Sequence, residues 1–158
     1  MIGEDVNRSS LAAVCAAAAL LSSFAAPAMA AAERQAPLKT VYGWAKKSGS
    51  SAMIVTPYRA TRTTVGDGPS IAWELSRKNG RPIRIDYTEG LIFRQVNKKC
   101  GKATAGYPYD TADKNALGTK VCDPIDLYNR LRKDRMPVKV VYDPAGPMAV
   151  KVIELVLP

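Results

Sequence analysis

Histidine is absent from this 158-residue chain, and its absence removes several classes of chemistry. Serine and cysteine nucleophiles that depend on a histidine base are excluded, and so are metal centres with histidine ligands. The sequence also lacks a G-x-S-x-G nucleophile motif and a glycine-rich phosphate loop. We therefore predict a protein that uses no cofactor and no metal ion, and that acts by binding.

The sequence also has no apolar run long enough to span a membrane. The longest run, residues 11–26, has 16 residues, whereas a spanning helix needs about 20. Arg8 precedes this run, and Ala28 and Ala30 supply the small residues that signal peptidase requires. The pattern predicts a secretory signal peptide over 1–30 with cleavage near Ala30, and secretion to the cell envelope or the medium.

The start of the chain departs from an ordinary signal peptide. Glu4 and Asp5 stand where a basic segment is usual. Translation from Val6 instead of Met1 would remove both acidic residues, and the two starts are alternatives.

Cysteine is scarce, with three residues in the chain and two, Cys100 and Cys122, beyond the predicted signal peptide. In an oxidising compartment an even pair indicates a disulfide, and only one pairing exists. The disulfide would close a polar loop, 100–122, that shows no strand or helix periodicity. We expect residues 31–37 to form a flexible tail and 38–158 a single β-rich domain.

Short runs of β-branched and aromatic residues predict strands over 38–47, 52–64, 71–76, 83–88 and 91–96. Pro57 indicates a sheet edge or a bulge in the second of these. Ile71, Trp73 and Leu75 are expected on a buried face. Asn79-Gly80 is a strong hairpin signal, so the strands on either side of it should pair and begin a three-stranded meander.

Only 123–135 has the pattern of a helix, with Asp123 as N-cap and an apolar stripe. The stripe comprises Ile125, Leu127, Tyr128 and Leu131. Two strands, 138–142 and 148–157, close the chain, and the apolar phase of the last suggests a bulge or burial on both faces. This order predicts an OB-like antiparallel barrel with one helix before a C-terminal hairpin. An α+β antiparallel sheet packed by one helix is the alternative.

Positive charge is in excess throughout. Without the signal peptide the chain has 22 Lys and Arg residues against 12 Asp and Glu, a net charge of +10. We predict a basic rim that binds an anionic ligand, with Trp44 as its aromatic platform. The predicted cations of this rim are Lys46, Lys47, Arg77, Lys78, Arg81 and Arg84.

Other candidates carry weaker signals. Tyr107 and Tyr109 flank a proline in the polar loop and would suit contact with a protein partner. Glu74 and Asp86 would face each other across paired strands, as a carboxylate hydrolase requires. A third candidate is a group of side chains whose oxygen atoms could bind calcium. It lacks the additional acidic ligand that a calcium loop needs, so an ordinary polar loop is the better interpretation. It comprises Asp110, Asp113 and Asn115.

The sequence thus predicts a secreted, non-catalytic binding module. An anionic extracellular or cell-wall polymer is the first partner, favoured over nucleic acid. A protein-binding or inhibitor-like module displayed on the 100–122 loop is the alternative, and a small carboxylate-dependent hydrolase comes third.

Overall fold

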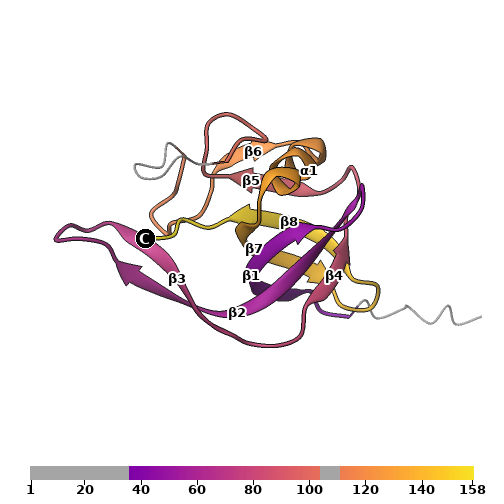
Figure 1. Ribbon diagram of the computed structural model, residues 1–158, viewed down its shortest axis with the longest axis horizontal. Helices are drawn as coiled ribbons and strands as arrows, with labels where there is room; N and C mark the ends of the chain where they lie inside the picture. Colours follow the sequence, from indigo (N-terminus) through magenta and orange to yellow (C-terminus); the bar gives the residue numbers. More distant parts are fainter. Residues whose placement is uncertain (1–35, 104–110) are drawn as a thin grey trace, which may run out of the picture. The chain divides into compact units, whose positions relative to one another are not determined.

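The chain is mainly β-structure, with eight strands in one mixed sheet and a single helix among the described residues (Figure 1). The computed structural model describes residues 36–103 and 111–158, which belong to the unit Arg34–Pro158. The predicted signal peptide, Tyr107, Tyr109 and Asp110 lie outside these residues. The elements are β1 Lys39–Lys47, β2 Ala52–Thr64, β3 Ile71–Lys78, β4 Ile83–Asp86, β5 Ile92–Gln95, β6 Lys120–Cys122, α1 Pro124–Lys133, β7 Met136–Asp143 and β8 Met148–Glu154.

The strand pairings form a circuit. β1 pairs with β2 and with β7, β7 pairs with β8, and β4 pairs with both β2 and β8. The contact of β4 with β8 places Asp86 opposite Met148, and the Asp86 N–H donates to the Pro147 carbonyl at 2.8 Å. β8 is parallel to both β4 and β5, so the expectation of a purely antiparallel sheet is wrong. β4 and β5 are each separated from β8 by a long stretch of sequence, as parallel pairing requires.

The Asn79-Gly80 segment does not form a hairpin, which corrects the predicted meander. β3 and β4 pair with β2 one after the other, β3 along Tyr58–Thr64 and β4 along Ala52–Val55. The Asn79 N–H donates to the Pro57 carbonyl at 2.9 Å, and Gly80 takes a positive φ of 136°. The 13-residue β2 is long enough to pair with both β3 and β4. Asn79-Gly80 therefore connects two consecutive strands that pair with the same neighbour, and the glycine permits the positive φ of this connection.

β2 itself is irregular, as Pro57 indicates. Its register with β3 shifts between Tyr58 and Ala60, immediately after the proline. Beyond the shift, the described residues pair the far half of β2 with β3 alone, and the two strands extend past β1 (Figure 1). The bulge interpretation of Pro57 is confirmed.

The alternation predicted for β3 is wrong at its first two residues. Ile71 is 39% exposed, whereas Ala72 is buried. The Trp73 N–H donates to the Val156 carbonyl at 2.7 Å, and Ala72 packs with Val156 in a second, smaller core. The C-terminal segment thus buries Ala72 on the side of β3 predicted to face solvent, while Glu74 and Ser76 on the same side stay exposed. The end of the chain is buried on both faces, as expected for 152–156.

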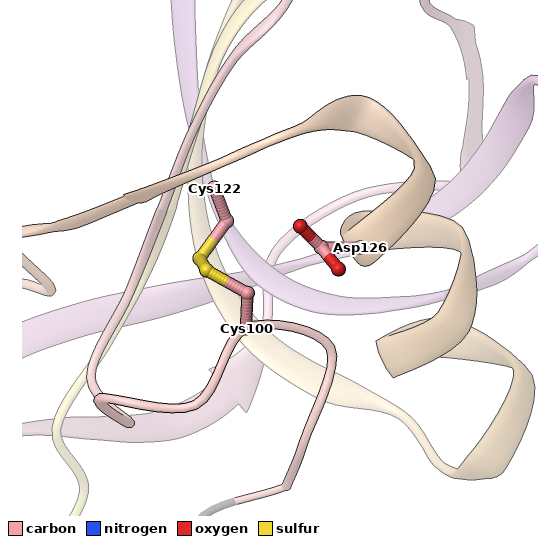
Figure 2. Close-up of side chains that lie close together, drawn as sticks. All are labelled: Cys100, Cys122 and Asp126. Atoms are coloured by element: carbon pink, nitrogen blue, oxygen red, sulfur yellow. A yellow bond between two sulfur atoms is a disulfide. The ribbon is translucent and has the colours of Figure 1, made fainter.

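The Cys100–Cys122 disulfide is confirmed, with the two Cα atoms 5.6 Å apart. Figure 2 shows it next to Asp126, whose carboxylate accepts the backbone N–H of Asp123 at 3.1 Å and so completes the start of α1. The three side chains lie within 4.8 Å of one another. Because both sulfurs are bonded and the carboxylate serves the helix, this cluster is structural. Gln95 holds the same loop, accepting from the Gly101 N–H and donating to the carbonyls of Lys99 and Lys102.

We expect the double substitution Cys100→Ser/Cys122→Ser to lower the free energy of unfolding by about 2–3 kcal/mol, because the open chain regains loop entropy. Chemical denaturation measures this difference. Reduction of the parent protein should lower stability by a similar amount. Native cysteines that react with an alkylating reagent before reduction would contradict the prediction.

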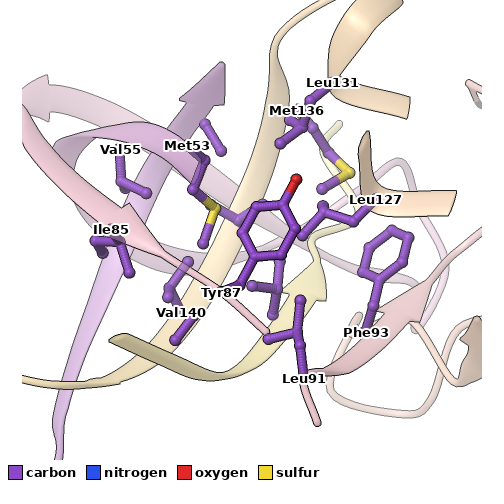
Figure 3. Close-up of a cluster of buried hydrophobic side chains, with 14 of the residues drawn as sticks. Met53, Val55, Ile85, Tyr87, Leu91, Phe93, Leu127, Leu131, Met136 and Val140 are labelled. Atoms are coloured by element: carbon purple, nitrogen blue, oxygen red, sulfur yellow. The ribbon is translucent and has the colours of Figure 1, made fainter. Parts of the chain in front are cut away.

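The main core lies between the sheet and α1. Figure 3 shows its buried side chains, with Leu127 and Leu131 of α1 facing Phe93, Met53 and Tyr87. Ile125, predicted in the apolar stripe, is 61% exposed. Arg130 is buried in the last turn of the helix.

Candidate functional site

An open groove of about 490 Å³ lies where the start of β1 meets the middle of β2. We call it the tyrosine groove, because Tyr42, Tyr58 and Tyr142 line it together with the cations Lys39 and Arg59. Its other lining residues are Thr40, Val41, Pro57, Ala60, Asn79 and Ile83. Among the residues that the structure describes, no aspartate or glutamate lines the groove, so the charges of its described lining are all positive.

None of the predicted rim cations is among the described lining residues of the groove, but the backbone of two of them lies next to lining residues. Lys78 lies directly opposite Tyr58 in the β2–β3 register, and Arg81 follows Gly80, which is close to Pro57. Both cations are exposed. The backbone of Lys78 and Arg81 thus lies near the groove because of the break between β3 and β4, and not because of a hairpin turn.

Arg77 and Arg84 are exposed as predicted and, like Lys78 and Arg81, are not among the described lining residues of the groove. Arg84 pairs with Asp86 at 3.2 Å on the solvent-facing side of β4. Both side chains are at least half exposed, so this ion pair adds little stability. The predicted set of four cations around one turn is therefore divided.

Lys46 and Lys47 lie at the other end of β1 from Lys39, and the groove does not include them. The Lys47 ammonium donates to the Tyr128 hydroxyl at 3.2 Å and lies 4.6 Å from the centre of its ring. This contact joins β1 to α1. Lys47 therefore has a structural partner, which the sequence did not indicate.

Trp44 lines a different pocket, of about 200 Å³, which we call the Trp44 pocket. The Arg135 guanidinium carbon lies 4.2 Å from the centre of the Trp44 ring. The charged residues of the pocket are Arg130, Asp134, Arg135 and Glu154, and its apolar lining is Val96, Pro137, Leu155 and Leu157. The other tryptophan, Trp73, is half-buried, stacks on Tyr42 and donates its indole N–H to the Asn115 carbonyl.

Arg130 and Glu154 form a buried ion pair that the sequence analysis missed. The guanidinium and carboxylate are 3.4 Å apart, with side-chain exposures of 7% and 2%. The other carboxylate oxygen accepts the Val96 N–H at 3.0 Å. Burial raises the pKa of Glu154, against the opposing effects of the Val96 N–H and Arg130. The signal in the sequence that could have indicated this buried pair is the single glutamate within the apolar run 152–157.

A further group of cations surrounds the end of α1. The pKa of Lys133 is lowered, chiefly by the charge of Lys102, and also by burial and by Arg132 and Arg130. The loop closed by the disulfide therefore brings Lys102 to the basic end of the helix.

The remaining candidates do not form sites. Glu74 lies opposite Thr61 on β2 and Asp86 lies opposite Ala52, so no strand pairing joins the two carboxylates, and the predicted juxtaposition is wrong. Asp113 accepts the N–H groups of Asn115 and Leu117 at 2.8 and 3.0 Å, as a loop-forming aspartate does.

No family model, curated protein or solved structure matches this chain. Within residues 36–103 and 111–158 no helix is long and apolar enough to cross a membrane.

Proposed function

We propose that this chain is an exported, non-catalytic protein that binds an anionic polymer of the cell envelope or its surroundings through the tyrosine groove. The observation that carries the proposal is a groove lined by three tyrosines and two cations, with no acidic residue among its described lining residues and with Lys78 opposite the lining residue Tyr58 in the strand register. Cations along a groove attract a polyanion, and Tyr58 is the tyrosine placed to add contacts to its repeating units, because Tyr142 is buried and Tyr42 stacks on Trp73.

Export is supported by the apolar run 11–26 and the small residues that follow it, which predict a mature chain beginning at Ala31. The disulfide is consistent with an oxidising compartment.

An OB-like barrel is supported by the circuit of β1, β2, β4, β8 and β7. The helix lies between β4 and β7, the third and fourth strands of that circuit in chain order, which is where the OB topology has its helix. On this proposal β3, β5 and β6 are additions to a five-stranded barrel.

Reversing Arg59, Lys78 and Arg81 to glutamate should abolish retention on heparin and on polyphosphate at 0.15 M salt. A bound polyanion releases about one counterion per cation that it contacts, so the slope of log affinity against log salt should fall by about 2–3. Affinity is measured by titration at several salt concentrations. Exposed charges contribute little to stability, so the variant should stay folded.

The matched control reverses Lys114, Lys120 and Arg132, which are exposed and absent from the groove lining. It changes the net charge equally and should keep most of the binding. Equal loss in both variants would show that only net charge matters. Unchanged binding in the groove variant would instead favour the 100–122 loop, with Tyr107 and Tyr109, as a protein-binding surface.

A further inference from the structure

The Trp44 pocket contains two guanidiniums, Arg130 and Arg135, and two carboxylates, Asp134 and Glu154. Arg130 makes two long contacts, 3.4 Å to Glu154 and 3.5 Å to the Asp134 carbonyl, and its buried Nε has no partner in the structure. Charge-assisted bonds of this type are normally 2.7–2.9 Å. Among the described residues, the Nε–H of this guanidinium thus lacks an acceptor, and its other two contacts are long.

The acidic groups of the pocket are already engaged. Glu154 accepts from Val96 and Arg130, and one Asp134 oxygen accepts the Arg135 N–H at 2.7 Å. The Arg135 guanidinium contacts the Trp44 ring, and no carboxylate of the described residues pairs with it. Two guanidiniums therefore line one small cavity in which the carboxylates have internal donors.

We propose that the Trp44 pocket binds a carboxylate, held by Arg130 and Arg135, whose adjoining apolar atoms contact Trp44 and Leu155. Arginine pairs with carboxylates through two parallel N–H donors, and the tryptophan and leucine surfaces accept aliphatic groups. The cavity of about 200 Å³ is smaller than the 300–1,000 Å³ of typical ligand sites. The ligand is thus a short free carboxylate or the carboxyl end of a peptide. This site is distinct from the tyrosine groove.

The two tryptophans provide a direct test. With ¹⁵N-labelled tryptophan, the protein should give one indole signal from Trp44 and one from Trp73. Titration with propionate should shift the Trp44 signal to saturation at millimolar concentrations and leave the Trp73 signal in place. Propionamide, which has the same shape without the charge, should shift neither. A Trp44 signal that does not respond to propionate or to the peptide below, or equal shifts of both signals, would overturn the proposal.

Titration with trialanine and with its C-terminal amide distinguishes the two sources of the carboxylate, a peptide end and a free small carboxylate. Binding of trialanine at least tenfold tighter than propionate, with no binding of the amide, would assign a peptide end. Comparable affinities would assign a free small carboxylate.

Arg135→Gln should weaken binding about tenfold, as loss of one charge-assisted contact predicts. This residue is exposed, so the fold should survive the change. Arg132 lies on α1, is also exposed and does not line the pocket, so the Arg132→Gln variant should bind like the parent. Equal affinities of the Arg135 variant and the parent would also contradict the assignment.

Discussion

Gly43→Ala is expected to lower the free energy of unfolding by about 3 kcal/mol or more, or to prevent folding. Gly43 lies in β1 between Pro57 of β2 and Val138 of β7. A Cβ there would overlap the Thr56 carbonyl oxygen and lie 2.9 Å from its carbon and 3.1 Å from the Pro57 Cα. These are backbone atoms, so relief requires β1 and β2 to separate. Thermal and chemical denaturation measure the loss.

Gly146→Ala is the matched control. Gly146 lies in the turn between β7 and β8, has no positive φ, and has open space where a Cβ would be. Alanine should change stability by no more than about 0.5 kcal/mol, or stabilise slightly by restricting the unfolded chain. Equal effects of the two substitutions would contradict the account of Gly43.

Arg130→Met should lower the free energy of unfolding by about 3–5 kcal/mol at pH 7, because it leaves the Glu154 carboxylate buried without its cation. Adding Glu154→Gln should recover much of this loss. The Gln amide is neutral, and its oxygen can still accept the Val96 N–H. A double variant less stable than the single one would show that the pair is not the source of the effect.

The effect of Arg130→Met should depend on pH in a defined direction. Burial already holds the pKa of Glu154 above its ordinary value near 4.5, and loss of Arg130 removes an opposing influence. A carboxyl whose folded pKa is raised contributes most stability below its unfolded pKa and loses it as pH rises. The deficit of the variant relative to the parent should therefore be smaller at pH 4.5 than at pH 7. A deficit that grows on acidification would contradict this.

Local chemistry in the sequence determined most of the elements, but not β6, which lies at the end of the loop predicted to contain no strand. Alternation gave the strands on either side of Asn79-Gly80, and Asp123 and Pro124 gave the start of α1. The disulfide followed from counting, since only one pairing was available. The strands and the start of α1 depend on residues within a few positions of one another. The disulfide depends only on there being a single possible pair of cysteines.

The tertiary structure alone decided which strands pair, because pairing depends on residues far apart in the chain. Asn-Gly permits a positive φ in a hairpin and in a strand break equally, and the length of β2 selected the break. That choice placed Lys78 opposite Tyr58 and Arg84 opposite Ile54, at different positions along β2. It also separated Glu74 from Asp86.

The buried ion pair has the same origin. Arg130 belongs to a helix and Glu154 to the last strand, and each alone has the sequence context of an exposed charge or an exception in an apolar run. Their burial follows only when α1 packs on the sheet and the segments of Val96 and Gly118 lie against Glu154. The sequence determined that the chain forms a basic, disulfide-linked β domain. Packing between distant segments determined where its charges gather, because burial is a property of the assembled layers.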